Sequence, residues 1–131
     1  MQHKVHKRLS NGQTASIYFR LDRNQRFTDG YYYDCWYVAF VVGDHRSLNN
    51  RWWAGHSKLY DDKSTGRCGV EGLMWAKKEL LAFMDARSSD VYQWVVLDPT
   101  DDRRGRAYSR LKKDGFLPGV YDEANVLMKR F

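Results

Sequence analysis

STGRCGVEGLMWA, the stretch from Ser64 to Ala76, passes from a loop of small, polar and charged residues into a segment with helical periodicity. Apolar residues then recur at steps of three and four, and this spacing predicts a helix from Val70 to Ala86. The predicted buried stripe contains Val70, Leu73, Ala76, Leu80 and Met84, widened by Met74 and Leu81. A loop that leads directly into a helix gathers unpaired backbone N–H groups at the positive end of the helix dipole, which favours an anion there.

A predicted strand lies on each side of this loop and helix. VYQWVVL, Val91 to Leu97, is a short apolar run typical of an interior strand, and Pro99 ends it because proline cannot continue a ladder. WWAGHSKLY, Trp52 to Tyr60, is the predicted strand on the N-terminal side, with Gly55 as a candidate bulge. A strand, a crossover helix and a second strand imply at least one parallel pair.

The remaining segments complete a mixed sheet. SIYFRL, Ser16 to Leu21, and the run from Tyr31 to Val42 are typical of strands, and their short connection makes them antiparallel. The other predicted segments are a turn-rich Asp22 to Gly30, a loop Asp44 to Asn50, a helix Arg103 to Asp114 stopped by Gly115, and one or two closing strands within Phe116 to Phe131. We therefore expect one α/β (α+β) domain, residues 1–131, whose mixed, mainly antiparallel sheet is flanked by helices.

Composition narrows the class of protein. Apolar residues make up 43% of the chain, enough for a core. The longest apolar run, Cys35 to Val42, is too short to span a bilayer. The polar, basic N-terminus, Met1 to Ser10, precedes no apolar segment of a signal peptide. With Cys35 and Cys68 as the only cysteines, a reducing compartment is the simpler interpretation, and we expect a soluble cytoplasmic protein with no membrane contact.

The net charge of +6 is concentrated in two segments. Residues 1–26 contain six Lys and Arg against the single acid Asp22, and residues 103–113 contain six Lys and Arg and no acid. Such segments attract phosphate in nucleic acid, in a nucleotide cofactor or on an acidic partner. A solvated helix face that aids solubility explains the same pattern.

The order of the strand Trp52 to Tyr60, the loop and helix, the strand Val91 to Leu97 and a basic helix ending in Lys112-Lys113-Asp114-Gly115-Phe116 resembles the core of the GCN5-related N-acetyltransferase family over roughly residues 50–131. The resemblance implies an acetyltransferase-like fold in which the two strands around the glycine loop diverge and acetyl-CoA lies between them. Its pyrophosphate would be bound by backbone amides of the loop and helix start, and Arg103 and Arg104 would meet the adenosine phosphate end. The residues of this predicted amide cradle are Gly66, Arg67, Cys68, Gly69 and Val70.

Acetyl transfer needs a base for the amine and an acid for the departing thiolate. His56 and Glu71 are the candidate bases, His56 first because its unperturbed pKa lies near neutrality. A half-buried strand histidine is the other interpretation of His56. The family places its general-acid tyrosine at the position of Leu111, so Tyr108, one turn earlier, is the reserve acid.

Neither cysteine chemistry nor a metal is needed for this reaction. Cys68 precedes a predicted helix start, where a thiolate would be favoured, but a bystander small residue is the preferred interpretation. His3 and His6 lie in a basic tail without a third ligand, so we predict no metal site.

Two functions follow from these patterns. The first is an acetyl-CoA-dependent N-acyltransferase acting on an amine that the sequence does not identify. The alternative is a non-catalytic, basic binding or inhibitor protein on the same scaffold, of the kind phage genomes encode, with nucleic acid or an acidic host protein as its partner. A small fold that matches the helix-strand-helix pattern by chance is a third interpretation.

Overall fold

The computed structural model describes residues 2–55, 69–88, 92–97, 110–121 and 123–131. Its secondary structure follows the chain as β1 (Gln2–Arg8), β2 (Thr14–Arg26), β3 (Tyr32–Gly43), α1 (Arg46–Trp53), α2 (Gly69–Arg87), β4 (Trp94–Leu97), the short 3-10 helix η1 (Arg110–Asp114), β5 (Leu117–Tyr121) and β6 (Ala124–Arg130).

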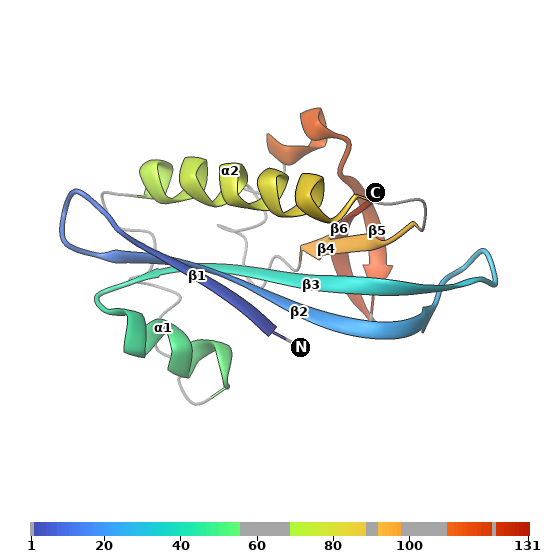
Figure 1. The fold of residues 1–131 in the computed structure, drawn as a ribbon, viewed down its shortest axis with the longest axis horizontal. Helices are drawn as coiled ribbons and strands as arrows, with labels where there is room; N and C mark the ends of the chain where they lie inside the picture. Colours follow the sequence, from blue (N-terminus) through green and yellow to red (C-terminus); the bar gives the residue numbers. More distant parts are fainter. Residues whose placement is uncertain (1, 56–68, 89–91, 98–109, 122) are drawn as a thin grey trace.

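The described strands form one six-stranded sheet in the order β1-β2-β3-β4-β6-β5. β3 and β4 run parallel, and every other neighbouring pair runs antiparallel. α1 and α2 lie on opposite faces of the sheet (Figure 1). The expected mixed, mainly antiparallel sheet is confirmed. Its parallel pair joins β4 to β3 and not to the predicted strand from Trp52 to Tyr60.

The main core lies between the sheet and α2. Alternate residues of the central strands, such as Ile17, Phe19 and Val38, point to this face because side chains along a strand alternate between faces. Leu80 and Phe83 of α2 are buried against them, and the rings of Phe19 and Phe83 stack with centroids 3.8 Å apart. The helix predicted from Val70 to Ala86 is thus confirmed in α2.

One part of the predicted helical stripe is wrong. Met74 is 68% exposed. It lies on the opposite side of α2 from the buried Ala76, because two residues correspond to about 200° of helical rotation. Phe83, which the predicted stripe did not include, is part of the main core.

The opposite face of the sheet is covered at one end by α1. Trp53 stacks on Tyr18 of β2 with ring centroids 5.0 Å apart, and the hydroxyl of Tyr18 donates a hydrogen bond to Asn50 Oδ1 at 2.9 Å. Asn49 is completely buried here, and its amide donates to Thr14 O at 2.9 Å and to Ser16 Oγ at 2.8 Å. A buried amide that satisfies strand groups therefore holds α1 against the sheet.

The predicted strand from Trp52 to Tyr60 is wrong where the structure describes it. Trp52 and Trp53 form the last turn of α1, and Gly55 follows with φ +82° in a turn rather than a bulge. The predicted loop from Asp44 to Asn50 is also wrong from Arg46 onward, because α1 begins there. The buried residue of α1 is the polar Asn49, and Trp53 stacks on Tyr18 beside it. A helix whose buried position is polar is difficult to recognise from the spacing of apolar residues.

The N-terminal residues form a strand and not a tail. β1 pairs antiparallel with β2 from Gln2 to Arg8. His3 contacts Phe19 on the α2 face, whereas His6 contacts Tyr18 on the α1 face, so the two histidines point to opposite sides of the sheet.

Two further boundaries differ from the expectation. β2 continues through Arg26, inside the segment predicted as turns, and the turn itself is closed by Gly30 N–H donating to Phe27 O. Of the helix predicted from Arg103 to Asp114, residues 103–109 lie outside the described residues, and Arg110–Asp114 is a 3-10 helix. Gly115 has the predicted left-handed φ of +90°, and both closing strands are present as β5 and β6.

Candidate functional site

The start of α2 lies against the end of β3. A Cβ atom added at Gly72 would meet Val42 Cγ2 at 3.0 Å and Phe40 Cζ at 3.3 Å. Glycine at this position lets the first turn of α2 approach the sheet more closely than any side chain would permit. The positive end of the α2 dipole is therefore fixed at the carboxyl end of β3.

β3 extends beyond the strand that runs parallel to it. β4 pairs with β3 only from Cys35 to Val38, and β3 continues to Gly43. Among the strands of the described ranges, none pairs with Ala39–Gly43 on the side that β4 occupies. The start of α2 and this overhanging end of β3 thus lie at the same end of the sheet (Figure 1).

Glu71, one of the predicted bases, holds the β1–β2 turn. Its carboxylate accepts hydrogen bonds from Ser10 N–H at 3.1 Å and from the Ser10 hydroxyl at 2.7 Å. Through these hydrogen bonds Glu71 joins the β1–β2 turn to α2. Its action as a base stays a prediction.

Of the predicted cofactor-binding residues, the structure places Gly69 and Val70 as the first two residues of α2. The other predicted site residues lie outside the described residues: His56, Gly66, Arg67, Cys68, Arg103, Arg104 and Tyr108. The structure therefore locates the helix start that the sequence predicted and does not test the remaining assignments.

No described helix has the length and apolar character needed to cross a membrane. Within the same part of the chain, no group of three or more His, Cys, Asp or Glu residues is placed to hold a metal ion.

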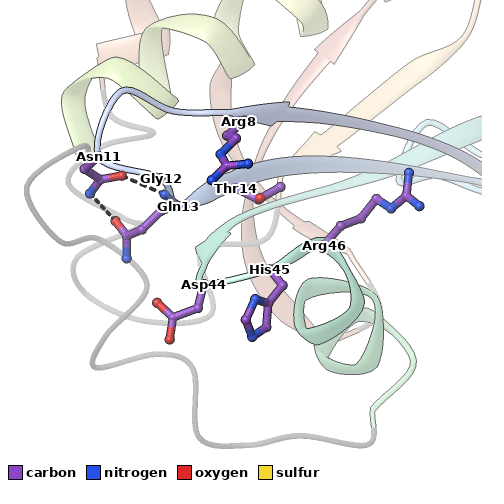
Figure 2. Close-up of a pocket in the computed structure, with 8 residues that line it drawn as sticks. All are labelled: Arg8, Asn11, Gly12, Gln13, Thr14, Asp44, His45 and Arg46. Atoms are coloured by element: carbon purple, nitrogen blue, oxygen red, sulfur yellow. Dashed lines mark hydrogen bonds between the residues drawn. The ribbon is translucent and has the colours of Figure 1, made fainter.

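A pocket opens between the β1–β2 turn and the first residues of α1 (Figure 2). Its volume is about 500 Å³. The lining residues are almost all polar or charged: Arg8, Asn11, Gly12, Gln13, Thr14, Asp44, His45 and Arg46.

Hydrogen bonds fix both walls of this pocket. In the turn, Asn11 Oδ1 accepts from Gln13 N–H at 2.9 Å, and Leu9 N–H donates to Gln13 O at 2.7 Å. Leu9 is buried in the main core, so the turn cannot move without breaking packing. The α1 wall is held by the bonds of Asn49 to Thr14 and Ser16.

A row of hydrogen-bonded polar side chains lies beneath α1 and includes His6 of β1. Ser16 Oγ lies 2.6 Å from His6 Nδ1 and also accepts from the Asn49 amide. The pKa of His6 is lowered from its ordinary value, first by burial and then by the positive charges of Arg46 and Lys4. Arg46 and Lys4 are therefore close enough to His6 for their charges to disfavour its protonated form.

A second titratable cluster lies farther along the same face of the sheet. The hydroxyl of Tyr121 donates to Asp22 Oδ2 at 2.7 Å, and Arg20 Nε pairs with Asp22 Oδ1 at 3.0 Å. Beside them Cys35 is completely buried, and this burial raises the pKa of its thiol to about 12. A thiol with this pKa is protonated at neutral pH, so Cys35 is not a nucleophile.

The pocket residues were missed by sequence reasoning. Arg8 and Arg46 are far apart in the chain, and only the pairing of β1 with β2 and of β2 with β3 brings them together. The excess of Lys and Arg in residues 1–26 is the sequence feature that could have indicated the pocket. It includes Arg8 but not Arg46, so it indicates one wall of the pocket. Comparisons with protein-family models, with curated proteins and with solved structures give no significant match.

Proposed function

We propose that this chain is an acetyl-CoA-dependent N-acyltransferase whose cofactor binds by its pyrophosphate at the start of α2. The supporting observation is the parallel pair β3 and β4, whose connection along the chain contains α1 and then α2, with α2 beginning against the overhanging end of β3. In open sheets with parallel strands, ligands bind in the crevice outside the carboxyl ends of the strands.

The groups at this helix start suit an anion. The helix begins at Gly69, and the first N–H groups of a helix have no acceptor within the helix. The single acid in the first turn, Glu71, is bonded to Ser10 on the β1–β2 turn. Within the proposal, the loop residues Gly66, Arg67 and Cys68 add further amides to the same cradle.

Bound acetyl-CoA supplies a thioester, whose acetyl group passes to the acceptor nitrogen as the carbon–sulfur bond breaks. In the proposal His56 accepts the proton that the amine loses, and Tyr108 returns a proton to the thiolate. Cys35 is excluded from any covalent acyl intermediate because its thiol is buried and protonated. Transfer is thus expected to proceed without Cys35.

Calorimetric titration with acetyl-CoA tests the binding step, and release of free thiol in the presence of primary amines tests the transfer. A carboxylate introduced by Gly69→Asp at the helix start should weaken cofactor binding about tenfold by repelling phosphate. Met74→Asp adds the same charge at an exposed position of α2 and is the matched control. The proposal fails if acetyl-CoA does not bind at millimolar concentration, or if both variants weaken binding equally.

The basic face around β1 favours the second candidate, a nucleic-acid-binding protein without catalysis. Lys4 and Arg8 are exposed on β1, and Arg46 and Arg51 are exposed on α1. Affinity for a single-stranded oligonucleotide that falls steeply with salt, together with no response to acetyl-CoA, would support this candidate. Equal binding at low and high salt would exclude it.

A further inference from the structure

The pocket between the β1–β2 turn and α1 has the size and the charge of a ligand site. Its volume of about 500 Å³ lies within the range of small-molecule sites and exceeds the size of a single inorganic anion. Arg8 and Arg46 both line it, and neither forms an ion pair with another residue in the parts of the chain that the structure describes. Among the described residues, Asp44 is the only carboxylate in the lining.

The backbone of α1 adds to this positive character. His45 is the N-terminal cap residue and makes no side-chain capping bond, and the first turn contains no acid. The first helical hydrogen bond runs from Asn49 N–H to His45 O at 3.2 Å, so the amides of Arg46, Ser47 and Leu48 precede it. These amides stand at the positive end of the α1 dipole, beside the pocket.

Cationic side chains are crowded along this side of the sheet. Figure 2 shows Arg8 beside the turn, while the Arg46 side chain extends from the pocket along the strands. The positive charges of Arg46 and Lys4 both lower the pKa of His6. An anion bound in the pocket would offset this repulsion among like charges.

We propose that this pocket binds a phosphorylated small molecule through its phosphate group. The phosphate contacts are Arg8, the first amides of α1 and Arg46, whose side chain turns from its position along the strands toward the ligand. Asn11, Gln13 and Thr14 then face the remainder of the ligand with hydrogen-bonding groups. The site is separate from the acetyl-CoA site proposed above and does not depend on it.

Backbone amide shifts in ¹H–¹⁵N spectra test the site, with inorganic phosphate and AMP as probes and adenosine as the control that lacks phosphate. We expect saturable shifts at Gly12–Thr14 and Asp44–Arg46 for phosphate and AMP, and none for adenosine. Absence of saturable shifts at these amides up to about 20 mM of either anion would overturn the proposal, because that affinity is too weak for a specific site.

Charge variants separate a built site from diffuse attraction. Arg8→Gln and Arg46→Gln should each weaken AMP binding about tenfold, as expected for a lost charge-assisted hydrogen bond. Arg51→Gln removes the same charge from the exposed last turn of α1, outside the pocket, and should change affinity less than about twofold. Equal weakening by all three variants would contradict the proposal, as would binding of an oligonucleotide without binding of phosphate or AMP.

Discussion

His6 joins the basic face to the hydrogen bonds beneath α1. Its pKa lies below the ordinary 6.5, with burial as the largest cause, so the neutral ring is preferred in the folded chain. Between the folded and the unfolded pKa, the unfolded chain binds more protons than the folded chain. The free energy of unfolding therefore rises with pH in this window and falls as the solution is acidified below about 6.5.

Replacing this histidine should flatten that dependence. The variant His6→Gln keeps a hydrogen-bonding side chain beside Ser16 and cannot titrate. Urea unfolding at pH 7.5 and pH 5 should show a smaller loss of stability in His6→Gln than in the original chain. His45→Gln removes an exposed histidine and serves as the control. An identical pH dependence in the original chain and in His6→Gln would contradict this role of His6.

Cys35 offers a second test at the scale of one side chain. Because burial raises the pKa of its thiol to about 12, its thiolate is scarce at pH 8 and its sulfur is not accessible. Alkylation of Cys35 by iodoacetamide at pH 8 should be at least ~100-fold slower in the folded chain than in guanidinium chloride. Peptide mass mapping reads Cys35 separately from Cys68. Equal rates in the two conditions would show that the Cys35 thiol is exposed.

Among the elements, the packing of α2 on β3 depends on Gly72. The variant Gly72→Ala raises helix propensity by about 1 kcal/mol, but its methyl group would lie 3.0 Å from Val42 Cγ2 in a buried site. Overpacking of this kind costs about 1–3 kcal/mol, so we expect net destabilisation of about 1 kcal/mol in chemical unfolding.

A double-mutant cycle isolates the cause of that loss. In a Val42→Ala background the contacting methyl groups are absent, so Gly72→Ala should there become neutral or stabilising. If Gly72→Ala has the same effect in both backgrounds, the close approach of α2 to Val42 does not limit stability.

The sequence predicts some elements and hides others for physical reasons. β3 and α2 were predicted because their apolar residues follow the period of a strand and of a helix. β1 was missed because as an edge strand it places only Val5 among the apolar residues of the main core, between charged and polar neighbours. α1 was missed because its buried residue is Asn49. This side chain stabilises the packing of α1 through hydrogen bonds, and a polar residue gives no hydropathy signal.

The candidate site was predictable to a similar degree. The helix start at Gly69 follows from a glycine loop placed before an amphipathic segment, and the structure places it as predicted. The pairing of Glu71 with Ser10 and the meeting of Arg8 with Arg46 depend on contacts between distant parts of the chain. No local pattern encodes such contacts, so sequence reasoning could not supply them.

For the molecule as a whole, the arrangement gathers positive potential at one end of the sheet. The start of α2, the start of α1 and the β1–β2 turn all lie there, and the chain carries a net charge of +6 (Figure 1). Two helix starts on opposite faces give two separate places for an anion. The proposed cofactor site and the proposed phosphate pocket are therefore expected to respond to different ligands at different amides.

Binding of the CoA pyrophosphate at the start of α2 is measured by mapping backbone amide shifts during titration with CoA. If the pyrophosphate binds there, we expect saturable shifts at Gly69, Val70, Glu71 and Gly72, retained when Arg8 and Arg46 are both replaced by Gln. Shifts that are absent from these four amides at millimolar CoA, or that occur only at Gly12–Thr14 and Asp44–Arg46, would contradict it.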